Sequence, residues 1–186
     1  NTTPINATAN DIITASTRYE DMDGDILATN YRWSNSTNVL QGYSTAVTFD
    51  CTTFVGKCVR GQPTILDIYA SDSLNNSLTN TTNITIYNAF PIHSQPILNS
   101  TNGSVAYARA NLTAYNNSTL DRDRDNVINV YRWFRNGALQ GSINNSTATV
   151  NSSLLAKGDN WTAEITPIDN ESLNGTPMNA TIQIMN

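Results

Sequence analysis

Five short motifs each occur twice, in the same order and about 100 residues apart. The chain is therefore predicted to be a duplicated unit of about 90 residues. Asp21–Asp25 lies ten residues before Tyr31–Trp33, and Asp121–Asp125 lies ten residues before Tyr131–Trp133. Three further pairs match downstream: Val39–Gly42 with Ala138–Gly141, Leu66–Ile68 with Ala163–Ile165, and Asn83–Ile86 with Asn179–Ile182. Any fold must therefore be one that a single unit of this size adopts twice.

The boundary between the copies is marked by a recurring Pro-Ile pair, at Pro4-Ile5 and at Pro91-Ile92. We expect repeat 1 over residues 1–87 and repeat 2 over 88–186. Asn186 then falls where a further repeat would begin. A chain that stops in phase with its repeat is expected of a segment cut from a tandem array, or of a subunit whose ends meet head to tail.

Short alternating apolar patterns predict β-strands in both copies. Tyr131 and Trp133 alternate with polar residues, as do Tyr31 and Trp33, and turn residues follow every 8–12 positions or so. Asn136-Gly137 is a strong hairpin signal because both residues tolerate positive φ. No window shows helical periodicity. The chain is therefore expected to be all-β.

About seven strands and one Trp on the third strand predict an immunoglobulin-like sandwich, so the fold class is two tandem immunoglobulin-like β-sandwich domains. Trp33 and Trp133 are expected in the cores, with an exposed sugar-binding platform as the alternative. Trp161 has no aromatic counterpart in repeat 1, where Thr64 aligns. It is the better candidate for a surface aromatic, although a core position is still favoured.

The polar residues of this chain are dominated by asparagine rather than by charged side chains. Charged residues are only 13% of the chain, about half the usual share, whereas asparagine occurs 27 times. Asn-X-Ser/Thr sequons, which mark N-glycosylation in exported proteins, number 18. Composition alone would produce many of them by chance. The candidates are Asn1, Asn6, Asn35, Asn75, Asn80, Asn83, Asn99, Asn102, Asn111, Asn116, Asn117, Asn144, Asn145, Asn151, Asn160, Asn170, Asn174 and Asn179.

The two cysteines agree with export. Cys51 and Cys58 enclose a six-residue loop, and in an oxidising compartment they would form a local disulfide. The alternative, a reactive or metal-binding pair, has no His or further Cys nearby. We therefore expect an extracellular, cell-surface location.

The run Asn111–Asp125, followed by Tyr131–Gly137, resembles tandem immunoglobulin-like or cadherin-like modules of large archaeal and bacterial cell-surface proteins. The resemblance covers both repeats. It implies stalks, adhesins, surface-layer proteins or filaments, and it specifies the type of module rather than its task. Repeat 1 departs from the pattern because it lacks Asn-Gly after its Trp.

Alternating aspartates are the best candidate for a chemical site, because a tight loop can aim several carboxylates at one Ca²⁺ ion. Downstream aspartates at matching positions would complete each set. The predicted ligands are Asp21, Asp23, Asp25 and Asp72 in repeat 1, and Asp121, Asp123, Asp125 and Asp169 in repeat 2. The alternative is a solvated acidic turn without metal, and Arg122 and Arg124 would neutralise part of the second set.

Catalysis finds little support, so we expect no enzyme. The single His, at position 93, lies in a linker between two prolines, and no phosphate loop or nucleophile motif occurs. The net charge of −5 provides no footprint for nucleic acid. No apolar run is long enough to span a membrane.

The function expected is therefore structural: an N-glycosylated repeat of an extracellular filament, stalk or surface layer, joined end to end to copies of itself or to neighbouring repeats. The alternative is an adhesin or ligand-binding module that recognises a glycan or protein partner. A non-catalytic module of a secreted enzyme is a third possibility.

Overall fold

The computed structural model describes residues 2–3, 6–22, 24–53, 56–72, 74–101 and 103–185. Three predicted site residues, Asn1, Asp23 and Asn102, lie outside this part of the chain. Contacts divide the chain into two compact units. Unit 1 comprises Asn1–Ala89 with Arg122–Arg124, and unit 2 comprises Phe90–Asp121 with Asp125–Asn186. Each unit is described by itself.

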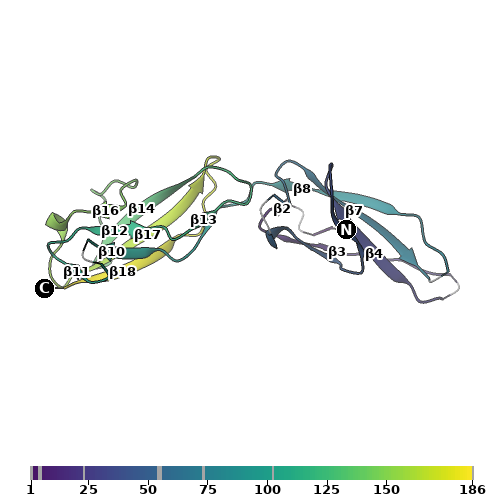
Figure 1. Ribbon diagram of the computed structural model, residues 1–186, viewed down its shortest axis with the longest axis horizontal. Helices are drawn as coiled ribbons and strands as arrows, with labels where there is room; N and C mark the ends of the chain where they lie inside the picture. Colours follow the sequence, from purple (N-terminus) through teal and green to yellow (C-terminus); the bar gives the residue numbers. More distant parts are fainter. Residues whose placement is uncertain are drawn as a thin grey trace. The chain divides into compact units, whose positions relative to one another are not determined.

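Unit 1 consists of two β-sheets (Figure 1). The smaller sheet has the order β1-β3-β6, formed by β1 (Thr2–Thr3), β3 (Ile12–Ala15) and β6 (Thr48–Asp50). The larger has the order β2-β8-β7-β4-β5, formed by β2 (Ala7–Thr8), β8 (Asn80–Tyr87), β7 (Pro63–Ser71), β4 (Ala28–Ser34) and β5 (Val39–Ser44). One turn of 3-10 helix, η1 (Cys51–Thr53), follows β6.

Unit 2 repeats this plan. Its smaller sheet has the order β10-β12-β16, formed by β10 (Ile97–Ser100), β12 (Leu112–Tyr115) and β16 (Thr149–Val150). Its larger sheet has the order β11-β18-β17-β14-β15, formed by β11 (Ala106–Tyr107), β18 (Met178–Met185), β17 (Asn160–Asp169), β14 (Val127–Arg135) and β15 (Ala138–Leu139). It adds η2 (Ser152–Leu154) and a two-stranded sheet of β9 (Ile92–His93) with β13 (Thr119–Leu120).

The three-stranded and five-stranded sheets have the same strand order in both units, which confirms the predicted fold class of two immunoglobulin-like sandwiches. The last strand of each unit pairs in parallel with a short early strand, through Ala7 with Ile86 in unit 1 and Ala106 with Ile184 in unit 2. The other ladders are antiparallel. Among the described residues, no helix is long and apolar enough to cross a bilayer.

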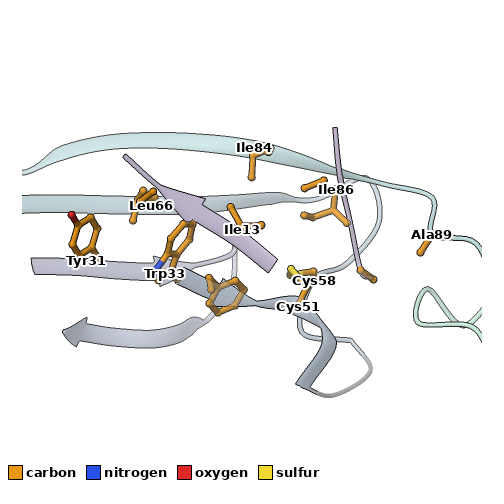
Figure 2. Packing of buried hydrophobic residues seen from close by; sticks show 13 residues of the cluster. Ile13, Tyr31, Trp33, Cys51, Cys58, Leu66, Ile84, Ile86 and Ala89 are labelled. Carbon is orange, nitrogen blue, oxygen red and sulfur yellow. A yellow bond between two sulfur atoms is a disulfide. The ribbon is translucent and has the colours of Figure 1, made fainter. Parts of the chain in front are cut away.

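The core of unit 1 lies between its two sheets (Figure 2). Trp33 on β4 is fully buried and stacks on Phe49 of β6, with ring centroids 5.4 Å apart. Ile13, Leu66 and Ile86 are buried around them. These residues come from alternate positions of their strands, so period-two patterning places them all on the inner face.

The core of unit 2 also pairs its Trp with a second aromatic ring, but that ring lies on the opposite sheet from the one in unit 1. Trp133 of β14 meets Trp161 of β17 edge to face, with centroids 6.4 Å apart. By register, Trp161 occupies the place of Thr64 in unit 1, and Val150 the place of Phe49. All four are buried. In each unit, one of these two positions holds an aromatic ring and the other a smaller side chain, so the core volume stays filled.

The predicted hairpin at Asn136-Gly137 is present. It joins β14 to β15, where Arg135 pairs with Ala138, and both turn residues have positive φ, 50° and 82°. This is the geometry of a type I′ turn, which matches the twist of the flanking strands.

Candidate functional site

Three aspartates of unit 2 form the one group of potential metal ligands found among the described residues. Carboxylate oxygens of Asp121, Asp125 and Asp169 all lie within 4.8 Å of one another. Asp121 and Asp169 are 8% and 3% exposed, and Asp125 is half-buried. Asp121 and Asp125 lie between β13 and β14, and Asp169 ends β17.

Backbone N–H groups bind two of these carboxylates, those of Asp169 and Asp121. Oδ1 of Asp169 accepts from the N–H groups of Glu171 and Leu173, at 2.9 and 2.8 Å, in the turn that leads to β18. Oδ1 of Asp121 accepts weakly from the N–H of Asp125, at 3.5 Å. The turns thus orient the carboxylate of Asp169 and, more weakly, that of Asp121.

Three close carboxylates repel one another when ionised, and partial burial strengthens the repulsion. A divalent cation would offset that repulsion, and hard carboxylate oxygens suit Ca²⁺. The buried triad can therefore bind a metal such as Ca²⁺. The fourth ligand predicted for this repeat, Asp123, is not part of the group. Its carboxylate accepts a 2.5 Å hydrogen bond from the N–H of Ala89, within unit 1.

The corresponding aspartates of unit 1 are not assembled into such a group among the described residues. Asp72 caps the turn after β7 as Asp169 does after β17, accepting from the N–H groups of Asn75 and Leu74, at 2.6 and 2.8 Å. These bonds lower the pKa of Asp72, whereas the charge of Asp21 opposes the shift. Asp25 is exposed, and the arrangement including Asp23 stays a prediction.

The sequon asparagines lie on the surface of both units. Of the 16 that the structure describes, 12 are exposed, four are half-buried and none is buried. The half-buried ones are Asn35, Asn99, Asn111 and Asn116, and the exposed ones are Asn6, Asn75, Asn80, Asn83, Asn117, Asn144, Asn145, Asn151, Asn160, Asn170, Asn174 and Asn179. Their placement is compatible with glycans on every face where they occur.

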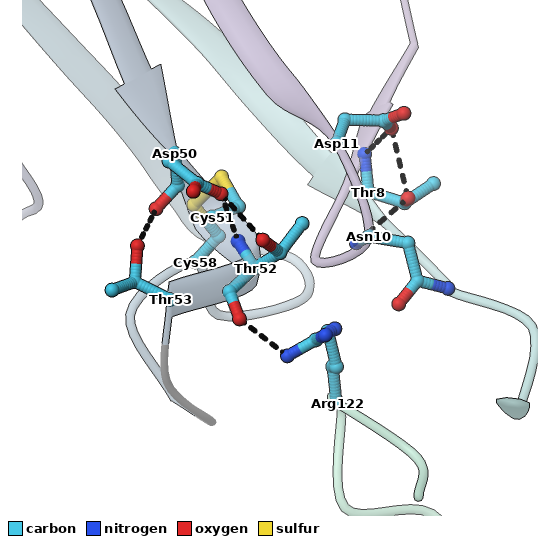
Figure 3. Close-up of a disulfide and its surroundings, with 9 residues drawn as sticks. All are labelled: Thr8, Asn10, Asp11, Asp50, Cys51, Thr52, Thr53, Cys58 and Arg122. Carbon is cyan, nitrogen blue, oxygen red and sulfur yellow. Dashed lines mark hydrogen bonds between the residues drawn. A yellow bond between two sulfur atoms is a disulfide. The ribbon is translucent and has the colours of Figure 1, made fainter. Parts of the chain in front are cut away.

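Cys51 and Cys58 form a disulfide, and their side chains belong to the core of unit 1 (Figure 3). Asp50, just before the loop, accepts from the N–H and the hydroxyl of Thr52, both at 2.7 Å. The hydroxyl of Thr53 in turn donates to the carbonyl of Asp50 at 3.0 Å. The disulfide loop therefore begins in a well-bonded turn.

Sequence patterns did not single out an ion pair that crosses the larger sheet of unit 1. Arg32 on β4 binds Asp67 on β7 through Nε and Nη2, at 3.0 and 2.6 Å, and Thr81 on β8 donates to the same carboxylate at 2.6 Å. Burial of Asp67 would raise its pKa. The hydrogen bonds from Thr81 and Arg32, with the charge of Arg32, outweigh this and lower it. Arg132 and Glu164 repeat the pair in unit 2, at 2.9 Å.

Unit 1 also has a groove that no motif indicated. It has a volume of about 400 Å³, and its walls are residues 17–21 on one side and 68–70, 72, 75–77 and 80 on the other. Tyr69, Thr29 and Leu27 are among its lining residues, and Asn75 and Asn80 are exposed where they line it. We call it the unit 1 groove. It arises only when the segment before β4 packs beside the β7–β8 turn, so local sequence gave no signal for it.

Comparison with known proteins found no matching family model and no matching curated protein. Several solved structures are similar in fold. Fibronectin(III)-like modules of Clostridium thermocellum CbhA are 14% identical, with a TM-score of 0.30, and the alignment covers 98% of this chain and 92% of theirs.

A two-domain fibronectin type III segment of chicken tenascin is 10% identical, with a TM-score of 0.34 and coverage of 98% and 96%. The chicken interferon gamma receptor alpha chain is 9% identical, with a TM-score of 0.48 and coverage of 97% and 95%. Identities this low leave function to be argued from the residues of this chain, which is similar to tandem fibronectin type III modules.

Proposed function

We propose that this chain is a non-catalytic, N-glycosylated structural repeat of an extracellular filament, stalk or surface layer. Its two sandwiches would be joined in series to further repeats or to copies of the same chain. The observation that carries the proposal is the surface position of every described sequon asparagine. A chain with only 13% charged residues needs another source of hydration, and glycans would supply it.

The disulfide supports an extracellular location, because such bonds form and persist in oxidising compartments. Glycans would also shield sheet edges, such as β5 and β15, from pairing with other chains. Electron microscopy of native material tests the role. We expect periodic beads with a spacing of roughly 4 nm, given about 3.3 Å per strand residue. Isolated particles without higher-order assembly would contradict it.

Glycan mapping by mass spectrometry tests the coating, and the adjacent sequons at Asn116 and Asn117 give the sharpest result. Asn117 is exposed, whereas the half-buried Asn116 donates from Nδ2 to Oδ1 of Asn129 at 2.9 Å. A glycan on Nδ2 removes one of its two donors and needs open space. We therefore expect a glycan on Asn117 and none on Asn116.

The pair Asn144 and Asn145 is the internal comparison, because both residues are exposed. Side-chain Oδ1 of Asn144 accepts hydrogen bonds from Ser146, which leaves the acceptor rather than Nδ2 engaged. Either residue of this pair is expected to carry a glycan. Occupancy at Asn116 with Asn117 bare, or bare asparagines throughout, would count against the proposal.

The alternative role, an adhesin that recognises a glycan or protein, receives less support. Trp161 is the better candidate for a surface aromatic by sequence, although a core position is favoured there, and it is 1% exposed and packed against Trp133. Sugar-binding surfaces commonly rely on accessible aromatic rings. A binding surface on this chain would therefore have to use other residues.

We also propose that the triad Asp121, Asp125 and Asp169 binds Ca²⁺ and stiffens its end of unit 2. A ligand that binds only the folded state, at 100 times its dissociation constant, stabilises by about 2.7 kcal/mol. For a domain of this size that corresponds to a rise in Tm of about 10 °C or more. We expect Ca²⁺ to raise the Tm of unit 2 and slow hydrogen exchange in 121–125 and 169–173, and a chelator to reverse both.

Asp169→Asn is the matching variant, because the amide keeps Oδ1 as acceptor for Glu171 and Leu173 but loses the charge. It should remove the response to Ca²⁺ while the unit stays folded. Asp72→Asn, at the equivalent turn of unit 1, controls for a general effect of the substitution. A Tm that does not change between millimolar Ca²⁺ and chelator would exclude the metal.

A further inference from the structure

The unit 1 groove has a counterpart in unit 2 that is filled by the chain itself. The correspondence follows from matching pairs at the far ends of β7 and β17. Ser71 bridges Asn76 in unit 1, and Ile168 bridges Asn174 in unit 2. The turn after β7 therefore corresponds to the turn after β17. The wall of the groove formed by 68–70, 72, 75–77 and 80 therefore has its counterpart in the end of β17 and the turn that follows it.

In unit 2 the segment Pro91–Gln95 contacts the elements that correspond to both walls of the groove, β13 and the turn after β17. On one side, β9 pairs with β13, His93 opposite Thr119, and the N–H of Ser94 donates to the carbonyl of Ser118 at 3.1 Å. On the other side, His93 Nε2 lies 2.8 Å from the carbonyl of Thr176.

The two ends of this segment are also held in unit 2. Gln95 Nε2 donates to the carbonyl of Asn179, and the flanking Pro91 and Pro96 are buried. An extended peptide thus forms part of this end of the sandwich in unit 2.

Unit 1 has both walls, with the groove between them. Residues 17–21 occupy the place of 116–120, which includes β13, since Ala15 corresponds to Ala114 near the end of the preceding strand. The strand register also sets Thr2 in the place of Leu98, because Thr2 pairs with Ala15 and Leu98 with Ala114. Residues that correspond to Pro91–Pro96 would therefore directly precede Asn1.

A buried hydroxyl in the groove gives a second, independent indication of a ligand. Thr29 is 9% exposed and lines the groove, and its Oγ1 finds no hydrogen-bond partner among the described residues. The equivalent residue of unit 2, Asn129, accepts a hydrogen bond from Asn116. An unsatisfied buried hydroxyl is unfavourable, so a polar group entering the groove would gain from meeting it.

We infer that the unit 1 groove binds an extended peptide segment that runs into the N-terminal side of this unit, as Pro91–Gln95 does in unit 2. The inference goes beyond the proposed function, because it depends on the groove and its counterpart and would apply to a module of any role. Backbone pairing with 17–21 would provide affinity, and the flanking prolines would keep the segment extended.

Two wall positions differ between the units, and they indicate how the fit can be improved. Gly175 of unit 2 has no room for a side chain, because a Cβ there would lie 2.1 Å from the carbonyl of Pro91. Unit 1 has Ser77 at this place, and its hydroxyl accepts from the N–H of Ala70 at 2.9 Å. Pro167, which replaces Ala70 in unit 2, has no N–H to satisfy. Because Ser77 has a side chain where Gly175 has none, the bound segment must lie farther from this turn in unit 1.

The test adds the nine residues of Asn88–Pro96 directly before Asn1 of the full chain and follows hydrogen exchange by mass spectrometry. We expect the amides of 17–21 to exchange at least about tenfold more slowly than in the unextended chain, and those of unit 2 to be unchanged. A scrambled extension of the same nine residues should give no protection. The double variant Ala70→Pro with Ser77→Gly, which copies the unit 2 wall, should increase the protection.

Equal exchange with the native and scrambled extensions, in both the natural and the copied wall, would overturn the inference. Two additional arms use the unextended chain: one adds a free peptide of the Asn88–Pro96 sequence, the other a simple oligosaccharide. Protection of 17–21 by either of these, without protection by the fused extension, would also overturn it. In the first case the occupant would come from another molecule, and in the second it would be a sugar.

Discussion

Replacing Trp133 by alanine is expected to lower the free energy of unfolding of unit 2 by about 3–5 kcal/mol. The side chain is 1% exposed and packs edge to face against Trp161, so its removal leaves a large cavity between the sheets. Its Nε1 also donates to the carbonyl of Thr147 at 2.9 Å, a bond that alanine loses. Because an isolated sandwich of this size is only marginally stable, unit 2 should be largely unfolded at physiological temperature. Segment-resolved hydrogen exchange of the full chain measures this directly.

A pair of Trp→Phe variants separates the loss of volume from the loss of the hydrogen bond. Trp33 in unit 1 is buried to the same degree, but its Nε1 has no partner among the described residues. Trp33→Phe should therefore lose packing only, whereas Trp133→Phe should lose packing and the bond to Thr147. We expect the second variant to be the more destabilised by about 1 kcal/mol. Equal losses would mean that the Thr147 bond contributes nothing to stability.

The fold was predictable because its determinants are local and occur twice. Alternation at Tyr31 and Trp33 recurs at Tyr131 and Trp133, and each pair lies on a strand with Trp inward. The Asn136-Gly137 turn needs only its own backbone to specify it. The disulfide was predictable for the same reason, because Cys51 and Cys58 are close in sequence.

Features that depend on which strands face each other were not predictable in the same way. The aromatic partner of the core Trp is Phe49 on β6 in unit 1 and Trp161 on β17 in unit 2. Trp161 therefore looked unmatched in a residue-by-residue comparison, although it fills the space that Phe49 fills from the opposite sheet. Position in the sequence shows the strand a residue belongs to, but not how core volume is shared between sheets.

A strand's period of two also hides errors of register. The sequence match of Asn83 with Asn179 is displaced by two residues, since register places Asn83, opposite Ile65, in line with Thr181, opposite Thr162. A shift of two leaves every side chain on the same face, so hydrophobic patterning cannot detect it. Pairing within the sheet decides the register.

The candidate metal site was predicted in part for a related reason. Alternating aspartates indicated a cluster, and Asp121, Asp125 and the distant Asp169 do lie together. The same alternation predicted Asp123 as a ligand, but its carboxylate accepts a hydrogen bond from the backbone N–H of Ala89 instead. The residues of a tight turn point in several directions, so spacing alone cannot select those that converge.

Removing the disulfide with the double variant Cys51→Ala and Cys58→Ala is expected to destabilise unit 1 by more than about 2–3 kcal/mol, and to leave unit 2 unchanged. The two cysteines are seven positions apart, and closing a loop of this length restricts the unfolded chain by roughly that amount. Both side chains are 1% exposed and pack within the core cluster that includes Ile86, so the lost sulfur atoms add a cavity to the effect.

Reduction of the wild-type chain separates these two contributions, because it opens the loop but keeps both sulfur atoms in place. We expect the reduced protein to lie between the oxidised wild type and the double alanine variant, and the variant to be insensitive to reductant. The turn at Asp50, which binds Thr52 and Thr53 through side chain and backbone, should keep η1 formed in all three. If the reduced wild type were as stable as the oxidised form, the disulfide would not restrict the unfolded chain. The cysteines would then serve unit 1 only as buried core residues.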